Sequence, residues 1–242
     1  ESGGSAAGGE AGEEGVTAPP ASEAPASATG GEAGEAGAAT AYAGLSGDQL
    51  TALRLQHLKG FVMAAAAVTA ENQPNEAGIL VQQGLLEVYD VAPDQFGTLN
   101  VAIIRAAGEG DTLNRAQRMQ RIRTAEDELN RAAAELEADP AITVARMVDV
   151  ATGLYSEVVQ PDFVDPIEYQ HSMGAALAAR DALIRAESQL RRANIPAYSE
   201  ARGALNSFVA LWPDAAAPER PTPYRDVLAQ GSRVRLALSP FL

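Results

Sequence analysis

Apolar residues recur every three or four positions from Ser46 to the end of the chain, which is the period of an α-helix and not of a β-strand. The first such run extends to about Ala70 and carries a histidine, His57, at the centre of its apolar stripe. Six positions fall on one side of this helix: Leu50, Leu53, His57, Phe61, Ala64 and Val68. The pattern predicts that this helix packs with that side against a core.

Helix start signals divide the rest of the chain in the same way. Ser46 and Gln49 are spaced as a capping box, Asp139 precedes a proline, and Asp165 with Glu168 repeats the box around Pro166. No stretch alternates as a strand would. The expected helices span about 46–70, 74–89, 94–107, 111–138, 140–158, 166–192, 196–211 and 224–238. We therefore predict an all-α fold, an antiparallel bundle of about six to eight helices.

Two of the expected helices have unusual faces. The helix over 111–138 is dense in Arg and Glu outside its apolar stripe, and this charged face is expected to be solvated. The helix over 166–192 is apolar nearly all round for four turns and is therefore predicted to lie centrally. Its alanine side either admits a neighbouring helix closely or borders a cavity. The cavity version would be lined by Phe61, Met173, Leu177 and Ala178.

The first 40 residues contrast with everything that follows. They contain no Leu, Ile, Phe, Tyr, Trp, Lys or Arg, and they hold seven glutamates among Gly, Ala, Ser, Thr and Pro. Such a segment cannot bury enough apolar surface to offset the entropy of ordering it. We predict a disordered acidic tether over residues 1–44 and a single helical domain over 45–242. The composition is similar to the spacer that follows the lipidated cysteine of bacterial lipoproteins, which indicates the periplasm or cell envelope.

Charge and composition exclude several classes of partner and chemistry. The chain has a net charge of −14, and the acidic body argues against nucleic acid and against anionic membrane surfaces. Membrane association is expected only through a lipid anchor that this chain does not contain. The absence of cysteine excludes disulfides and thiolate metal sites. No run of 18 apolar residues is present that would span a bilayer.

Two histidines are the main candidates for chemistry. His57 lies on the apolar face described above, where it is either a hydrogen-bonded core residue or a ligand to an internal site. Glu168 and His171 form a Glu-x-x-His pair on one helix face, although Glu168 also serves as a capping acid. Glu87, at the end of the second helix, comes near His57 if the first two helices form a hairpin. A divalent or iron ion is one candidate ligand for these four residues. No Walker, dinucleotide-binding, nucleophile-elbow or His-Glu-x-x-His motif occurs.

Four short segments resemble a family of bacterial envelope helical proteins that is more distantly similar to imelysin-type and iron-uptake bundles. They are residues 56–60 (QHLKG), 84–89 (GLLEVY), 165–170 (DPIEYQ) and 232–239 (SRVRLALS). The resemblance implies a helical fold and an envelope location. The distant relatives hold metal with Gly-x-His-x-x-Glu, which this chain lacks, and Val81 and Gln83 replace the histidines expected before Glu87.

Three functions follow as hypotheses. The first is a non-enzymatic, exported domain that binds a small ligand or an envelope protein, with a metal ion as one candidate ligand. The second is a carrier of an apolar, lipid-like molecule in an Ala/Leu-lined cavity. The third is a structural or adaptor protein without a ligand.

Overall fold

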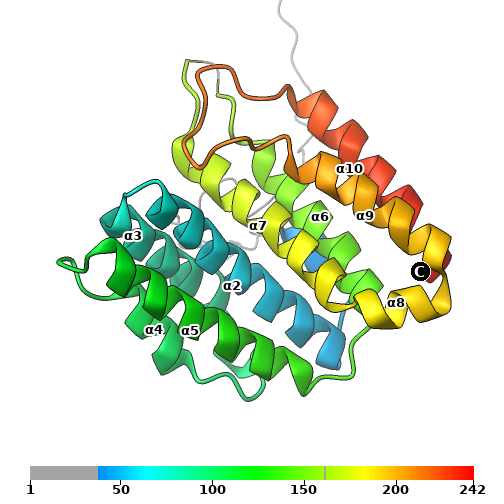
Figure 1. Ribbon diagram of the computed structural model, residues 1–242, viewed down its shortest axis with the longest axis horizontal. Coiled ribbons are helices and arrows are strands. Elements are labelled where there is room, and N and C mark those ends of the chain that lie inside the picture. The colour runs from blue at the N-terminus through cyan, green and yellow to red at the C-terminus, as the bar shows by residue number, and fades with distance from the viewer. Residues whose placement is uncertain (1–37, 161) are drawn as a thin grey trace, which may run out of the picture. The chain divides into compact units, whose positions relative to one another are not determined.

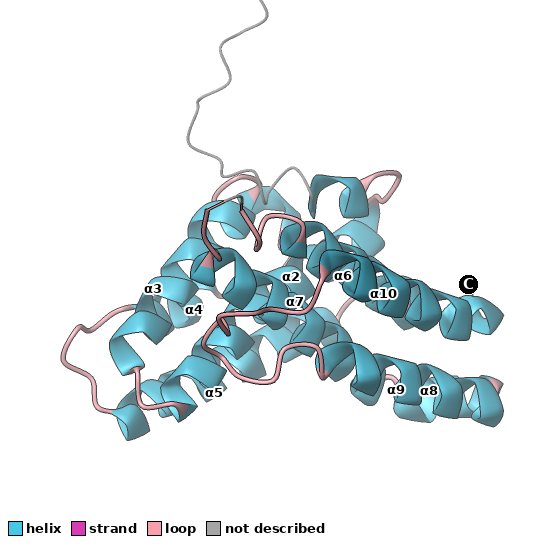
Figure 2. Ribbon diagram, turned by 90° about the horizontal axis from the view of Figure 1, so that it is seen from above, coloured by secondary structure: helices cyan, strands magenta, loops and turns pink. Residues whose placement is uncertain are grey.

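The computed structural model describes residues 38–160 and 162–242, and nearly all of the tether predicted before them lies outside these ranges. The described residues form nine α-helices and no strand, as Figures 1 and 2 show, so the all-α prediction is confirmed. The helices are α2 (Gly47–Ala70), α3 (Pro74–Gly84), α4 (Val101–Gly108), α5 (Arg115–Ala134), α6 (Pro140–Tyr155), α7 (Pro166–Arg185), α8 (Glu187–Ala193), α9 (Ile195–Val209) and α10 (Tyr224–Leu238). Short 3₁₀ turns cover Thr40–Tyr42, Pro93–Gln95 and Ser239–Phe241, and a π-helical turn covers Leu85–Tyr89.

Helices α2 and α7 pack against each other at the centre of the bundle (Figure 1). The central position predicted for α7 is confirmed, since 12 of its 20 residues are buried. The amphipathic pattern predicted one buried face for α2, but 14 of its 24 residues are buried and they lie on all sides of the helix. Helices α3 and α5 pack on α2, while α6 and α9 pack on α7, and α10 lies against α6 and α9. The contact between α2 and α7 therefore connects the helices that pack on α2 with those that pack on α7.

The close approach of α2 and α7 depends on two glycines. A Cβ on Gly174 would overlap the carbonyl oxygen of Gly60 and would lie 2.9 Å from its carbonyl carbon. Ala175, Ala178 and Ala179 on the same helix are at most 1% exposed. Of the two alternatives for the alanine side, the structure therefore shows close helix packing.

The predicted N-caps Asp139 and Asp165 are confirmed, but the reciprocal half of the box predicted at Asp165 does not form, because the Asp165 N–H donates to the Val158 carbonyl. The carboxylates of Asp139 and Asp165 accept hydrogen bonds from the first backbone N–H groups of α6 and α7. The capping box at Ser46 is wrong, because its side chain makes no capping bond. Gln49 turns away from this helix end. Its amide donates to Thr143 Oγ1 at 3.0 Å and accepts from the Asp139 N–H at 2.8 Å, which fastens the start of α2 to the start of α6.

Several helix boundaries differ from the prediction. The helix expected over 74–89 changes to a π-helical turn after Gly84, and α5 and α6 end at Ala134 and Tyr155, before the expected positions. The helix expected over 94–107 is a 3₁₀ turn followed by α4, and α5 begins at Arg115 because Asn114 and Gln117 form a reciprocal capping box. The helix expected over 166–192 is divided at Ala186, so the described ranges hold nine helices instead of eight. None of the helices in these ranges has the length and apolar character needed to cross a membrane.

Side chains of α5 form hydrogen bonds with backbone groups at both ends of the short helix α4. At the C-terminal end of α4, the guanidinium of Arg118 is buried and donates to four backbone carbonyls, those of Pro74, Ala107, Glu109 and Gly110, at 2.6 to 2.9 Å. These include carbonyls that a helix end leaves without partners. The prediction that the charged residues of α5 are solvated is therefore wrong for Arg118.

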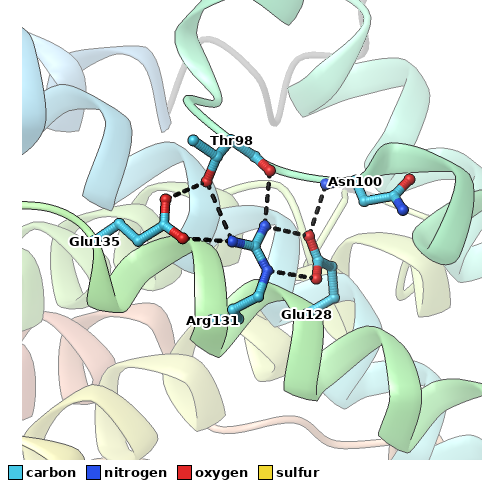
Figure 3. Close-up of polar contacts among 5 residues, drawn as sticks. All are labelled: Thr98, Asn100, Glu128, Arg131 and Glu135. Atoms are coloured by element: carbon cyan, nitrogen blue, oxygen red, sulfur yellow. Dashed lines mark hydrogen bonds and ion pairs between the residues drawn. The ribbon is translucent and has the colours of Figure 1, made fainter.

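A second polar cluster holds the other end of α4 (Figure 3). The buried carboxylate of Glu128 accepts from the Asn100 backbone N–H at 2.7 Å and receives two hydrogen bonds from Arg131, at 2.7 and 2.8 Å. Arg131 also donates to the carbonyl of Thr98 and to Glu135. The negative charge of Glu128 stands at the N-terminus of α4, where the helix dipole favours it.

Residues 38–42, which the sequence analysis placed in the tether, pack on the bundle. Ala38 and Ala41 are buried, and the hydroxyl of Tyr42 contacts His57. The predicted boundary at residue 44 therefore lies too late along the chain, because this segment already belongs to the core.

Candidate functional site

Three of the four predicted site residues lie near one another. His57 is on α2, His171 is on α7, and Glu87 is in the π-helical turn that follows α3. The ring of Phe61 contacts both imidazoles, with centroid separations of 5.6 Å to His57 and 4.6 Å to His171. These three predicted residues therefore lie close together, whereas Phe61, which was predicted to line a cavity, is a core residue.

His57 is only 7% exposed and is held by one neighbour, since the hydroxyl oxygen of Tyr42 lies 2.6 Å from its Nδ1. Burial lowers the pKa of His57 to about 3, and the nearby His171 and Arg54 act in the same direction. The ring is therefore neutral at pH 7. Its other nitrogen, Nε2, is buried and has no hydrogen-bond partner among the described residues.

Both ring nitrogens of His171 have polar neighbours. Its Nε2 lies 3.2 Å from the side-chain carbonyl oxygen of Gln83, and its Nδ1 is 3.7 Å from a carboxylate oxygen of Glu87. Burial lowers the pKa of His171 to about 4, so this ring too is neutral at pH 7 and its approach to Glu87 is not an ion pair.

The four residues do not form the predicted metal site. Glu168 is buried in the first turn of α7, where its backbone N–H donates to the capping residue Asp165. Within the described ranges, no three His, Asp or Glu side chains come together in an arrangement that could hold a metal ion. The two histidines are instead a Tyr-bonded and a Gln-bonded imidazole on either side of Phe61.

A pocket of about 270 Å³ opens beside His57, between residues 38–42, α2, the π-helical turn and α6. Five of its nine lining residues are apolar, and the other four are Tyr42, Arg54, His57 and Glu87. Its full lining is Ala38, Ala39, Tyr42, Arg54, His57, Glu87, Val88, Val91 and Leu154. Two of the predicted ligand residues, His57 and Glu87, therefore line a pocket.

The predicted cavity residues do not line this pocket. Phe61, Met173 and Ala178 are buried in the core, and Leu177 packs against it. The carbonyl of Ala178 accepts a hydrogen bond from Gln56, which places it at a helix contact. An Ala/Leu-lined cavity at these four positions is wrong, because the close approach of α2 and α7 leaves no space there.

Tyr42 and Arg54 also line the pocket, although the sequence pattern did not predict them as site residues. The guanidinium of Arg54 lies 5.0 Å from the centre of the Tyr42 ring and donates to Gln95 at 2.6 Å. Burial raises the pKa of the Tyr42 hydroxyl well above its usual range, so this group stays protonated. Tyr42 is the first aromatic residue of the chain, and that position was the one available signal that the core begins there.

A separate buried polar cluster surrounds Lys59, the one lysine of the chain. Its ammonium contacts Asp181 and donates to Asn130 at 2.7 Å, while Arg185 donates to Asp181 at 2.9 Å and to Gln56 at 2.6 Å. This cluster ties α2 and α5 to α7. Its charges face one another between the helices, so it acts as a structural network.

No arrangement among the described residues indicates catalysis. Comparison with protein-family models, curated proteins and solved structures found no match to this chain. The resemblance to envelope bundle proteins therefore stays a prediction.

Proposed function

We propose that this protein is a non-enzymatic binding domain of the bacterial cell envelope that holds a small, largely apolar ligand in the pocket beside His57. The observation that carries the proposal is the pocket itself, with five apolar lining residues around a buried, neutral imidazole. Ligand sites are commonly apolar concavities that contain a few placed polar groups. The π-helical turn in one wall adds support, because such turns occur frequently at functional sites.

The geometry favours an apolar ligand over a metal ion. A metal needs several convergent donors, and within the described ranges no group of three suitable side chains is present. One nitrogen of each histidine is also within reach of another side chain of the protein. The apolar ligand proposed here occupies a different place from the Ala/Leu-lined cavity of the sequence analysis.

The envelope location rests on the composition of the first 40 residues and on the resemblance described above. Fractionating cells that express the complete gene and labelling them with a radioactive fatty acid tests this part. We expect the protein in the envelope fraction. Recovery in the cytosol without label would contradict it.

Binding is tested with the fluorescent apolar probe N-phenyl-1-naphthylamine. We expect a saturable rise in fluorescence that Ala39→Phe weakens at least about tenfold, because a ring added to this exposed wall residue competes for the pocket. Ala102→Phe is the matched control, since Ala102 is an exposed alanine on α4 outside the pocket lining. Absent or unsaturable uptake, or equal loss in both variants, would overturn the proposal.

A further inference from the structure

We propose that residues 38–43, here called the strap, form a separable wall of the pocket beside His57, and that a bound ligand holds this wall on the bundle. The proposal rests on the proposed function, because it assigns the opening and closing of the same pocket. It follows from the contacts that hold the strap, from the link between the strap and α2, and from the part of the pocket that the strap supplies.

Side-chain contacts connect the strap to α2 and α6. The Tyr42 hydroxyl oxygen lies 2.6 Å from Nδ1 of His57, and the guanidinium of Arg54 lies 5.0 Å from the centre of the Tyr42 ring. Arg146 of α6 donates an exposed hydrogen bond of 3.3 Å to the carbonyl of Ala43. Single contacts of these kinds contribute little stability compared with the burial of a whole helix face.

The strap also buries little apolar surface of its own. Ala38 and Ala41 are buried but carry only methyl groups, and Tyr42 is partly buried. The backbone N–H groups of Ala43 and Leu45 donate to carbonyls three residues earlier in the chain. Releasing the strap therefore leaves the hydrogen bonds within the helices intact, so it costs less free energy than unfolding the bundle.

Two glycines in the left-handed region flank the link between the strap and α2. Gly44 has a φ of 77°, and Gly47, the first residue of α2, has a φ of 53°. A Cβ added to either glycine would have nothing within 4 Å, so the link is not packed against the bundle at these positions. Because glycine adopts other backbone angles readily, the strap can turn away while α2 keeps its place.

The strap supplies one wall of the pocket. Ala38, Ala39 and Tyr42 are three of the nine lining residues, and the others belong to α2, α6 and the π-helical turn with the residues next to it. Without the strap these remaining residues form an open surface, and Nδ1 of His57 loses the tyrosine hydroxyl. A ligand in the pocket therefore binds the form with the strap in place, and by linkage it stabilises that form.

A single introduced thiol reports opening of the strap, because the chain has no cysteine. Ala41→Cys places this thiol in the strap at a position 1% exposed, and Ala65→Cys places a control thiol in α2 at a position 0% exposed. Both full-length variants react with 5,5′-dithiobis(2-nitrobenzoate), and each rate is divided by that of the urea-unfolded variant. We expect Ala41→Cys to react at least about a hundredfold faster, because local opening exposes its thiol whereas the control requires global unfolding.

The fluorescent probe N-phenyl-1-naphthylamine tests the coupling to the ligand. At ten times its dissociation constant, it should slow the labelling of Ala41→Cys about tenfold, because the open form lacks the pocket. Adding Tyr42→Phe should speed this labelling about fivefold to tenfold, through the loss of one hydrogen bond. Tyr198→Phe, on α9 outside the pocket lining, should leave the rate unchanged.

Hydrogen exchange of the unmodified chain gives a second reading that needs no variant. The probe should slow exchange in residues 40–46 and leave exchange in α9 unchanged. Equal labelling of the two thiols, or labelling and exchange that the probe does not slow, overturns the separable strap and leaves the proposed function standing. Failure of the probe to bind overturns the proposed function and the coupling together.

Discussion

Gly60 of α2 and Gly174 of α7 meet backbone to backbone at the centre of the bundle. A Cβ on Gly60 would lie 3.1 Å from the carbonyl carbon and oxygen of Gly174, and the reverse substitution would be tighter still. Both neighbours are backbone atoms, which cannot rotate away as a side chain can. The separation of the two central helices is therefore fixed by the absence of two methyl groups.

The first prediction is that Gly174→Ala destabilises the protein by about 3 kcal/mol or more, because the two central helices must move apart. Urea unfolding measures the change. Gly203→Ala is the control, since Gly203 is in the interior of α9 and a methyl group added there would have nothing within 4 Å. That variant should gain about 0.5–1 kcal/mol from helix propensity. Similar stabilities of the two variants would contradict the close crossing.

The second prediction concerns Arg118. Arg118→Met should cost about 3 kcal/mol or more, because it leaves four backbone carbonyls without their donor. Hydrogen exchange should accelerate first in α4, whose C-terminal end Arg118 holds. Arg123→Met, an exposed arginine on the same helix, should change stability by less than about 0.5 kcal/mol. Slow exchange in α4 of the Arg118 variant would refute this role.

The third prediction concerns the cluster at the start of α4. Glu128→Gln should cost about 1–2 kcal/mol at pH 7, because the amide cannot accept both hydrogen bonds of Arg131. Those bonds hold the pKa of Glu128 below its usual range, so the difference from the wild type should persist at pH 5 and vanish only at lower pH. Glu135→Gln removes a half-exposed carboxylate and should have little effect. A loss of equal size in both variants would contradict the special role of Glu128.

The fourth prediction concerns pH. Both histidines have folded-state pKa values below 6.5, so below that pH the unfolded chain binds protons that the folded protein does not, and stability falls as pH falls. Between pH 7.5 and 5.5, each histidine should account for a loss of about 1 kcal/mol in the free energy of unfolding. His57→Gln and His171→Gln should each remove the loss caused by that histidine, as measured by urea unfolding at the two pH values. Since the chain has no other histidine, an unchanged pH dependence in the double variant would disprove this assignment.

Much of the fold was predictable because helix periodicity and capping are local. The starts of α6 and α7 followed from Asp139 and Asp165, and α10 begins and ends where the periodicity placed it. The approach of Glu87 to His57 followed from the apolar face and the expected hairpin, whereas the position of His171 beside Phe61 and Glu87 did not. Even so, the same kind of signal failed at Ser46, where Gln49 is bonded to α6 instead of its own helix end.

The sequence by itself determined the class of fold, the course of most helices and three residues that lie near one another in the folded protein. Only the tertiary structure decided which side chains are buried and which groups they contact, because the contacting groups are distant along the chain. Periodicity could not show that Arg118 and Lys59 are buried, since their partners lie on other elements. Nor could it show that Tyr42 pairs with His57 and that residues 38–42 form a pocket wall. The Glu168 and His171 pair, which the sequence offered as a metal site, is in the folded protein a buried glutamate in the first turn of α7 and a neutral imidazole beside Gln83.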